Sequence, residues 1–308
     1  MILTQPPGEA TAAVWVDLCA PTAEEIVRVR EATGLRVPTE AQVSEIESSS
    51  RLGFEGQAFY LSAPLVAPAG DGEVAIQQVG FVLSARVLLT VRFGPVASFD
   101  AAHAQAAATP PKSAADALLL ILELIVDRAA DALEHTGSDC EALAGAVFRA
   151  RHGRKKQSGK LGAALRRIGQ AAGELSHIRD ELLGLGRMAG YLTESGIEGA
   201  PALSAPRMKA IRADVTSLTD YQAHLQGKVQ FLLDATLGFI NIEQNEIVKT
   251  LTIASVVGIP PVIVAGIYGM NFHVMPELQW RFGYPYALAL IAVTGLLPLW
   301  WFRRRGWL

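Results

Sequence analysis

Two long apolar runs near the end of the chain constrain its fold more than any other feature. Leu251 to Tyr268 is a run of 18 residues and Tyr284 to Phe302 is a run of 19, and neither contains a charged residue. A helix needs about 20 residues to cross the hydrocarbon layer of a membrane. The segment between the runs, 269–283, is too short to form a domain. We therefore predict a membrane hairpin of two transmembrane helices joined by a loop.

The arginines that follow the second run indicate the orientation of this hairpin. Arg303, Arg304 and Arg305 come directly after Phe302, and positive residues that flank a transmembrane helix favour the cytoplasmic side. Because two spans return the chain to the same side, residues 1–248 are also expected in the cytoplasm. We predict a multi-pass protein of the inner (plasma) membrane whose N- and C-termini are both cytoplasmic.

The first 110 residues have the pattern of an α/β domain. Apolar stretches that are separated by Pro, Gly and Asp predict strands. The predicted strands are 12–18, 56–67, 74–84 and 86–93. Thr22, followed three residues later by Glu25, forms the capping box that starts a helix. A second short helix is expected from Thr39, and the break near Ser84 predicts a hairpin.

Residues 111–204 are expected to form a cytoplasmic helical region. Pro110 and Pro111 mark its boundary with the preceding domain, because proline favours turns over regular structure. The predicted helices cover 113–136, 139–151 and 159–194, and a Gly- and Pro-containing turn covers 195–201.

The segment 205–268 carries the longest helical pattern in the chain. Its apolar residues recur at spacings of three and four, and no proline interrupts them before Pro260. An unbroken helix of this length extends about 95 Å, of which a membrane crossing uses about 30 Å. The remainder is predicted to form a cytoplasmic stalk that associates with copies of itself. Pro260 and Pro261 lack backbone N–H groups, so we expect a kink there.

The composition and the motifs indicate a protein that is not an enzyme. A net charge of -3 does not favour nucleic acid as a partner. No Ser/His/Asp or paired-carboxylate arrangement can be argued from the spacing. The segment 153–160 resembles a phosphate-binding loop, but its spacing is one residue too long and Leu161 stands where Ser or Thr is required. We therefore expect no catalytic residue and no organic cofactor.

The loop at the tip of the predicted hairpin carries the most specific motif. Tyr-Gly-Met-Asn-Phe, residues 268–272, is followed by Met-Pro-Glu-Leu, residues 275–278. Together they resemble the signature of the CorA family of divalent-cation channels, which has Gly-Met-Asn at the end of its first transmembrane helix. Trp15 to Leu18, and the three arginines with the terminal Trp-Leu, also resemble family motifs. The ZntB zinc branch is a close relative of that family.

This resemblance implies a CorA-like homo-oligomeric funnel. The family forms homopentamers in membrane lipid, and its first transmembrane helix lines a central pore. It conducts divalent cations, chiefly Mg²⁺ and also Co²⁺ or Ni²⁺, and Mg²⁺ bound between cytoplasmic domains regulates it. The expected segments are the α/β domain 1–110, the helical region 111–204, the stalk with the first transmembrane helix 205–268, the extracytoplasmic loop 269–283, the second transmembrane helix 284–302 and the basic tail 303–308.

The resemblance also implies a line of pore residues on one helix. Carried over position by position, this line consists of Asp234, Asn245, Val248, Leu251, Ser255, Ile259, Val262 and Gly266. Residues 234 and 266 are separated by about nine helical turns of 3.6 residues, so these positions can share one face of the helix. The implied selectivity filter is Gly269, Met270 and Asn271, and the implied loop motif is Met275, Pro276, Glu277 and Leu278.

The chemistry of this line suits a hydrated Mg²⁺ ion. Mg²⁺ takes oxygen ligands and holds its water shell tightly, and a ring of Asn271 amides can hydrogen-bond that shell without removing it. Val248, Leu251 and Ile259 are expected to form apolar constrictions that gate the pore by drying. A ring of Asp234 carboxylates is expected to attract cations into the stalk.

Two other functions are compatible with the sequence. His273 lies in the loop, and imidazole suits Zn²⁺, Ni²⁺ and Co²⁺, so a ZntB-like transporter of Zn²⁺ is one alternative; otherwise His273 is a solvated loop residue. The second alternative is a cytoplasmic ligand-binding module for which the hairpin is only a membrane anchor. The sequence does not place the regulatory carboxylates, and the candidates by charge alone are Asp17, Glu24, Glu25, Asp131, Glu134 and Asp214.

Overall fold

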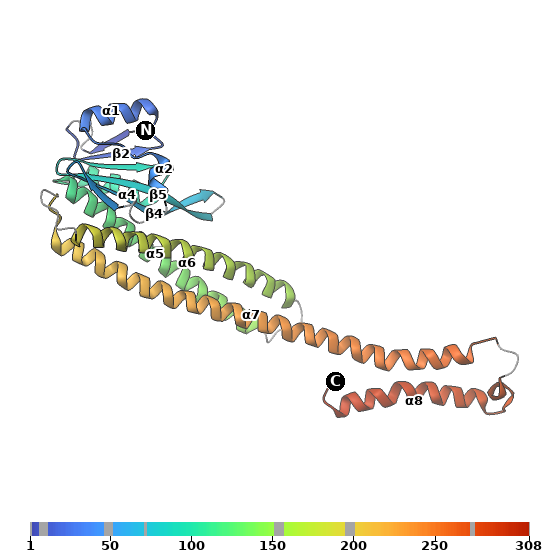
Figure 1. Ribbon diagram of the computed structural model, residues 1–308. Coiled ribbons are helices and arrows are strands. Elements are labelled where there is room, and N and C mark those ends of the chain that lie inside the picture. The colour runs from blue at the N-terminus through green and yellow to red at the C-terminus, as the bar shows by residue number, and fades with distance from the viewer. Residues whose placement is uncertain are drawn as a thin grey trace. The chain divides into compact units, whose positions relative to one another are not determined.

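The chain divides into two units in the computed structural model (Figure 1). The first unit comprises Met1–Ala150 and Gly162–Leu233, and the second comprises Arg151–Leu161 and Asp234–Leu308. The first holds a β-sheet with its helices, and the second holds a helical hairpin. The residues that the structure describes are 2–5, 12–45, 52–70, 73–150, 157–194, 201–271 and 275–307.

Six strands form one mixed sheet in the first unit, in the order β1-β2-β6-β5-β4-β3. The strands are β1 (Ile2–Gln5), β2 (Trp15–Cys19), β3 (Leu52–Glu55), β4 (Ala58–Gly70), β5 (Glu73–Ser84) and β6 (Leu88–Arg92). β2 and β6 run parallel, and the other neighbouring pairs are antiparallel. The four predicted strands and the hairpin near Ser84 are confirmed. The sequence pattern does not predict β1 and β3, because four residues carry too little alternation.

Two capped helices begin where the sequence predicts them. α1 (Ala23–Thr33) follows Thr22, whose hydroxyl accepts a hydrogen bond from the Glu25 N–H while the Glu25 carboxylate accepts one from the Thr22 N–H. α2 (Glu40–Val43) has the same kind of capping box, which starts at Thr39. Both predicted helix starts are therefore confirmed.

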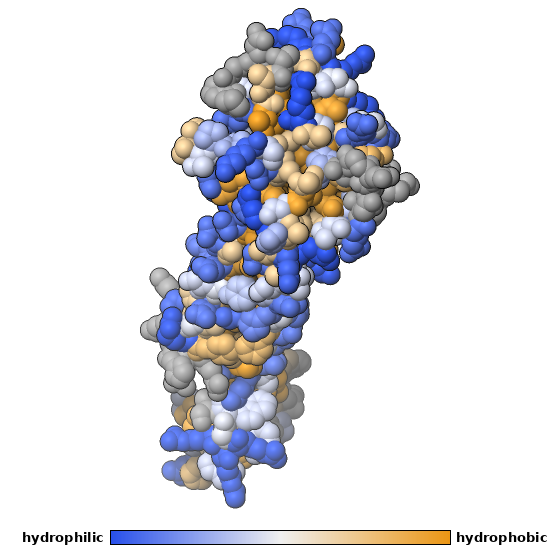
Figure 2. Space-filling model, turned by 90° about the vertical axis from the view of Figure 1, so that its left-hand side faces the viewer, coloured by the Kyte–Doolittle hydropathy of each residue, from blue (hydrophilic) through white to orange (hydrophobic). Residues whose placement is uncertain are grey.

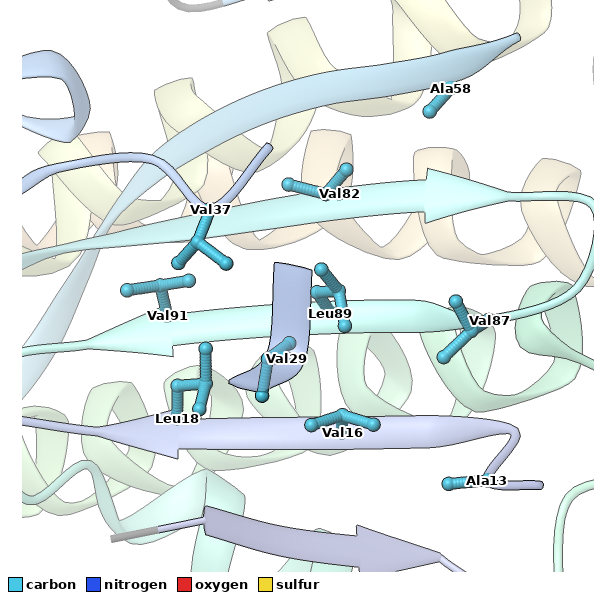
Figure 3. Close-up of a cluster of buried hydrophobic side chains, with 10 residues drawn as sticks. All are labelled: Ala13, Val16, Leu18, Val29, Val37, Ala58, Val82, Val87, Leu89 and Val91. Atoms are coloured by element: carbon cyan, nitrogen blue, oxygen red, sulfur yellow. The ribbon is translucent and has the colours of Figure 1, made fainter. Parts of the chain in front are cut away.

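An apolar core lies between α1 and one face of the sheet (Figure 3). Val16 and Leu18 of β2 and Leu89 and Val91 of β6 share this face, because alternate residues of a strand point to the same side. Val29 of α1 lies over them, and all five side chains are fully buried. α1 thus closes one side of the sheet.

The opposite face of the sheet packs against α4 (Ala97–Ala108) and α5 (Ala114–Ala150). Trp15 and Phe81 contact Phe99 of α4, with ring centroids 6.3 and 6.2 Å apart. The sequence pattern does not predict α4, because the helix is rich in alanine and no side chain caps its start. In the view of Figure 2, hydrophilic residues cover much of the part that holds the sheet, with smaller hydrophobic areas between them.

A single helix, α5, replaces the two helices predicted at 113–136 and 139–151. The predicted break lies at Gly137, but the helix continues through this residue. A Cβ on Gly137 would lie 2.8 Å from the hydroxyl of Tyr221, a residue of α7 (Ala205–Tyr268). The glycine therefore allows two helices to approach and does not form a turn, so the prediction of two helices is wrong.

α6 (Gln157–Glu194) and the first part of α7 complete the helical layer. The helix predicted at 159–194 is confirmed. The Gln222 side chain of α7 donates a hydrogen bond to the Leu175 carbonyl of α6 at 3.0 Å, and Gln222 is buried. The turn predicted at 195–201 lies, except for its last residue, outside the described residues.

Two helices are long and apolar enough to cross a membrane: α7 and α8 (Gly283–Arg304). No residue in the most apolar 18-residue window of α7 is buried. A 3₁₀ helix, η1 (Pro276–Gln279), lies between them in the chain. α7 continues as a helix through Pro260 and Pro261. Both predicted spans are therefore helical, and α7 reaches Tyr268 without interruption, as the sequence pattern predicts.

Candidate functional site

α7 and α8 pack side by side in the second unit, and two contacts define their antiparallel register (Figure 1). A Cβ built on Gly295 of α8 would lie 3.3 Å from Cγ of Pro261 of α7. The Nζ atom of Lys249 of α7 lies 5.7 Å from the ring centroid of Trp307, just beyond the end of α8. Lys249 and Pro261 are 12 residues apart in the sequence, as are Gly295 and Trp307. The two helices therefore keep the same antiparallel register from one contact to the other.

One face of α7 is covered by α8. Along the membrane-length segment, residues at spacings of three and four are half-buried, whereas most of their neighbours are exposed. The half-buried residues of this face are Ile253, Val257, Pro260, Pro261, Val264 and Tyr268. Both prolines therefore face protein, which is where breaks in backbone hydrogen bonding are tolerated in a membrane helix.

The predicted pore line lies on the opposite face of α7. A helix turns about 100° per residue, so Ile259 points about 200° away from Val257 of the covered face. Val248, Leu251 and Val262 of the predicted line are 60%, 67% and 70% exposed in the single chain. α8 thus leaves uncovered the face that carries Val248, Leu251, Ile259, Val262 and Gly266, and Ser255 on the same side of the helix is half-buried. Asn245 and Asp234 continue the same line toward the start of α7.

The C-terminal end of α7 leads directly into the Gly-Met-Asn motif. The Gly269 N–H donates to the Ala265 carbonyl at 2.9 Å, and the Met270 N–H donates to the Ile267 carbonyl at 3.3 Å. Helix-like hydrogen bonding therefore reaches Met270. Asn271 follows immediately, and its side chain is exposed. The motif places an amide just beyond the end of α7.

The remainder of the predicted loop motif is described in part. Met275 is half-buried and Pro276 is exposed. Glu277 and Leu278 belong to η1, but their side chains lie outside what the structure describes. His273, the predicted ligand of the zinc alternative, also lies outside the described residues. The role of these four loop positions and of His273 stays a prediction.

The uncovered face offers neutral oxygen atoms and apolar side chains to an ion. Between Asn245 and Asn271 the predicted line carries two amides, the hydroxyl of Ser255 and no charge. No group of three or more His, Cys, Asp or Glu side chains among the described residues is placed to hold a metal ion. A dehydrated divalent cation needs about six or more oxygen ligands, so the face of one chain suits an ion that keeps its water.

The end of the hairpin that contains the C-terminus is rich in cations placed over aromatic rings. Arg304 lies 5.4 Å from the ring centroid of Trp300, and Arg305 lies 5.0 Å from that of Trp301. Positive side chains and tryptophans thus occur together where α8 ends. Both are typical of the cytoplasmic membrane–water interface.

Asp17, a candidate metal ligand by charge, is fully buried in an ion-pair network. Its carboxylate accepts hydrogen bonds from Thr90 at 2.7 Å and Arg92 at 2.9 Å, and His103 Nε2 lies 3.0 Å away. Burial favours a higher pKa, but the hydrogen bonds from His103 and Arg92 outweigh it and hold the pKa of Asp17 below its usual value. The carboxylate is therefore engaged inside the fold and is not available to a regulatory cation.

Glu181 of α6 is a second buried carboxylate, which the sequence does not single out. Its Oε1 atom accepts a hydrogen bond from the Val66 N–H of β4 at 3.2 Å. Burial raises the pKa of Glu181 to about 8, so the side chain is mostly protonated at neutral pH. No motif marks this residue, because only the packing of α6 on β4 buries it.

The chain is similar to known magnesium transporters along almost its whole length. A family model described as "CorA-like Mg2+ transporter protein" matches residues 11–304. The magnesium transport protein CorA of Yersinia pseudotuberculosis is 31% identical over 302 residues, which are 97% of this chain and 93% of that protein.

Two solved structures show the same fold. The complete CorA magnesium transporter from Methanocaldococcus jannaschii has a TM-score of 0.73 at 20% identity, covering 96% of this chain and 91% of that chain. The ZntB cytoplasmic domain from Vibrio parahaemolyticus has a TM-score of 0.55 at 15% identity, covering 74% and 87%. The predicted fold, an α/β domain with long helices and two C-terminal candidate membrane helices, is confirmed.

Proposed function

The chain belongs to the CorA-like family of Mg²⁺ transporters, and on that premise we propose that it conducts divalent cations across the inner (plasma) membrane. Mg²⁺ is the principal ion, and Co²⁺ and Ni²⁺ are lesser ones. The observation that carries this proposal is the face of α7 that α8 leaves uncovered, on a helix that leads directly to Asn271. Polar groups in a membrane helix are costly unless they face protein or a water-filled cavity, and a pore supplies that cavity.

Copies of the chain would complete the pore. We propose a homopentamer, the assembly that the family resemblance implies, with α7 toward the axis and α8 toward the lipid. The packing of the hairpin supports this arrangement, because α8 covers only the side of α7 away from the predicted line. Segments 1–110 and 111–204 and both termini would be cytoplasmic, and the loop 269–283 would lie on the other side of the membrane.

Asn271 would recognise the hydrated ion at the outer mouth. Mg²⁺ dehydrates reluctantly, so an ion that enters with its first water shell avoids a large cost. A ring of Asn271 amide oxygens accepts hydrogen bonds from those waters. Asp234, at the cytoplasmic end of the same line, adds negative charge that attracts cations to the pore axis.

Val248, Leu251 and Ile259 would form the gate. Rings of apolar side chains in a narrow pore expel water, and a dry constriction blocks a hydrated ion. Inward flow needs no chemical step, because a membrane potential of 100 mV contributes about 2.3 kcal/mol per charge and twice that for a divalent ion.

Ion flux into liposomes that contain the purified full-length protein tests this proposal. We expect Mg²⁺ uptake by the wild type and at least a tenfold loss in Asn271→Ala. Gln279→Ala removes an exposed amide of η1 outside the Gly-Met-Asn motif, so this matched control should retain uptake. Equal uptake by both variants would contradict the role of the Asn271 ring.

The same assay separates the other candidate functions. Zn²⁺ uptake with little Mg²⁺ uptake would assign the protein to zinc transport, and its loss in His273→Ala would make His273 a ligand. The likeness to the ZntB domain concerns the fold and favours neither ion. No flux of either ion through a well-formed oligomer would favour a membrane-anchored ligand-binding module.

A further inference from the structure

A cavity of about 500 Å³ lies between α6 and the sheet of the first unit, far along the chain from the membrane hairpin. Its floor is formed by β3, β4 and β5, and its wall is formed by one face of α6. The lining residues are Leu52, Ser62, Pro64, Ile76, Gln78, His177, Asp180, Leu183, Gly184 and Arg187. Cavities that bind small molecules have volumes of about 300–1,000 Å³, so the space is large enough for a metabolite.

The cavity exists because α6 is held against β4 beside it. A Cβ on Gly184 would lie 2.5 Å from Cδ of Pro64, so the helix touches the strand there. One turn earlier, Glu181 accepts its hydrogen bond from Val66. Among the described residues, β3 pairs with β4 only as far as Leu61, so no described strand covers the adjoining part of β4. These contacts fix the wall and the floor relative to each other.

Two buried polar atoms on the floor have no hydrogen-bond partner among the described residues. They are Oγ of Ser62, a residue only 7% exposed, and Oε1 of Gln78. Ser62 and Pro64 are alternate residues of β4, and Gln78 of β5 pairs with Pro64, so all three share the face toward the cavity. Buried polar atoms are nearly always hydrogen-bonded in native proteins. Two such atoms lining one cavity indicate a ligand that supplies the missing partners.

The helical wall carries two solvent-exposed charges, on Asp180 and Arg187, that have no ion-pair partner among the described residues. His177, Asp180 and Arg187 lie on the face of α6 that lines the cavity. In the described part of the chain, none of these three side chains takes part in a hydrogen bond or an ion pair that would satisfy it. Asp180 and Arg187 are seven residues apart, or about 10 Å along the helix axis. The wall therefore presents an acceptor and a cation at separate places.

We propose that this cavity is a binding site for a small organic phosphate of nucleoside monophosphate size. The planar guanidinium of Arg187 suits bidentate binding of a phosphate, and His177 lies at the other end of the wall, one turn before Asp180. Asp180 and Gln78 accept hydrogen bonds from the amino groups at the other end of such a molecule. Pro64, Ile76 and Leu183 give apolar surface to its flat middle part. Inorganic phosphate is too short to reach both ends.

A bound metal ion does not account for the same features. Asp180 is the only carboxylate among the described residues of the lining, and these residues contain no cluster of three or more side chains placed to hold a metal. Arg187 would also repel a cation. None of the lining residues belongs to α7 or α8.

Isothermal titration of the purified full-length protein in detergent tests this site, with AMP as the probe. We expect saturable binding of AMP, and binding of inorganic phosphate and of adenosine that is at least tenfold weaker. Arg187→Gln should weaken AMP binding at least tenfold. Arg179→Gln removes an exposed arginine of the same helix that does not line the cavity, and it should bind AMP as the wild type does. Absence of saturable AMP binding, or equal affinities of the two variants, would overturn the proposal.

Ser62→Ala gives a second test, which does not depend on a charge. Removing an unpaired buried hydroxyl does not cost a hydrogen bond in the protein without ligand, so the melting temperature should stay the same or rise. AMP binding should weaken several-fold, because the ligand loses a partner. A lower melting temperature together with unchanged AMP affinity would show that Ser62 serves the fold and would overturn its role in the site.

Discussion

Gly295 of α8 lies directly against Pro261 of α7: a Cβ on the glycine would come within 3.3 Å of the proline ring and 3.9 Å of the Val257 carbonyl. Contacts as short as 3.3 Å force the neighbouring atoms to shift, and a proline ring held in a helix cannot move far. The glycine therefore lets the two helices approach at the point where α7 contains its two prolines. This contact lies on the face of α7 opposite the predicted pore line.

Gly295→Leu is expected to separate the hairpin at this contact. Overpacking of a tight contact costs about 1–3 kcal/mol, so the melting temperature of the purified protein should fall and Mg²⁺ flux should fall with it. Ala292→Leu adds a larger side chain on the exposed side of α8 and is the control. If both variants melt at the same temperature, the Gly295–Pro261 contact does not determine the packing.

Asp17→Ala is expected to destabilise the first unit strongly. The substitution leaves the guanidinium of Arg92, a residue only 4% exposed, without its carboxylate partner. Removing one partner of a buried ion pair lowers the free energy of unfolding by about 3–5 kcal/mol. For a unit of this size that corresponds to a fall of roughly 10 °C in melting temperature.

The control for this network is Asp100→Ala, which removes an exposed carboxylate from α4. Its melting temperature should stay close to that of the wild type. A fall for Asp17→Ala no larger than that for Asp100→Ala would show that the buried network contributes little. Both values are measured by thermal unfolding of the full-length protein in detergent, followed by circular dichroism.

Glu181 is expected to make stability depend on pH. The pKa of Glu181 is about 8 in the folded protein and about 4.5 when unfolded. The unfolded chain therefore releases the proton first, and stability falls as pH rises from about 4.5 to about 8, by up to about 1.4 kcal/mol per pH unit. Below this window the contribution of the protonated side chain is fully present.

Glu181→Gln should remove this dependence, because glutamine keeps the oxygen that accepts from Val66 but does not ionise. We expect the variant to melt at a higher temperature than the wild type at pH 8 and at nearly the same temperature at pH 5. Glu141→Gln, an exposed position on α5, is the control and should follow the wild type. A wild-type pH profile in Glu181→Gln would contradict the raised pKa.

The features that the sequence predicts correctly are those that local physics determines. A helix that is long and apolar enough to span a membrane requires an unbroken apolar run, and Leu251 to Tyr268 is such a run. The capping box at Thr22 requires only residues three positions apart. The long helix α7 follows from apolar spacing and from the absence of an early proline. In each case the cause of the structure lies inside the segment itself.

The features that the sequence does not predict depend on distant partners. Gly137 looks like a helix break, yet its function is to admit the Tyr221 hydroxyl from another helix. Glu181 looks like a surface residue, yet a strand 115 positions away buries it. The proposed pore residues show the same limit, because the face of α7 becomes uncovered only through the packing of α8 on the other side.

Leu251→Asn is expected to open the proposed gate. Leu251 is 67% exposed on the uncovered face of α7, and asparagine has a similar length but holds water, so the constriction should no longer dry. Lowering the barrier by about 1.4 kcal/mol raises flux tenfold, and we expect an increase of this order in liposomes that contain high internal Mg²⁺. Stopped-flow fluorescence of a trapped Mg²⁺ indicator measures it.

Two controls separate gating from a general effect of polarity in the membrane. Leu296→Asn places the same polar group on an exposed position of α8, outside the predicted line, and should not raise flux. Combining Leu251→Asn with Asn271→Ala should abolish the added flux, because a Mg²⁺ ion that passes the open gate must still enter at the amide ring. Equal increases in Leu251→Asn and Leu296→Asn would mean that the bilayer leaks, and a double variant that conducts freely would mean that the ion does not pass Asn271.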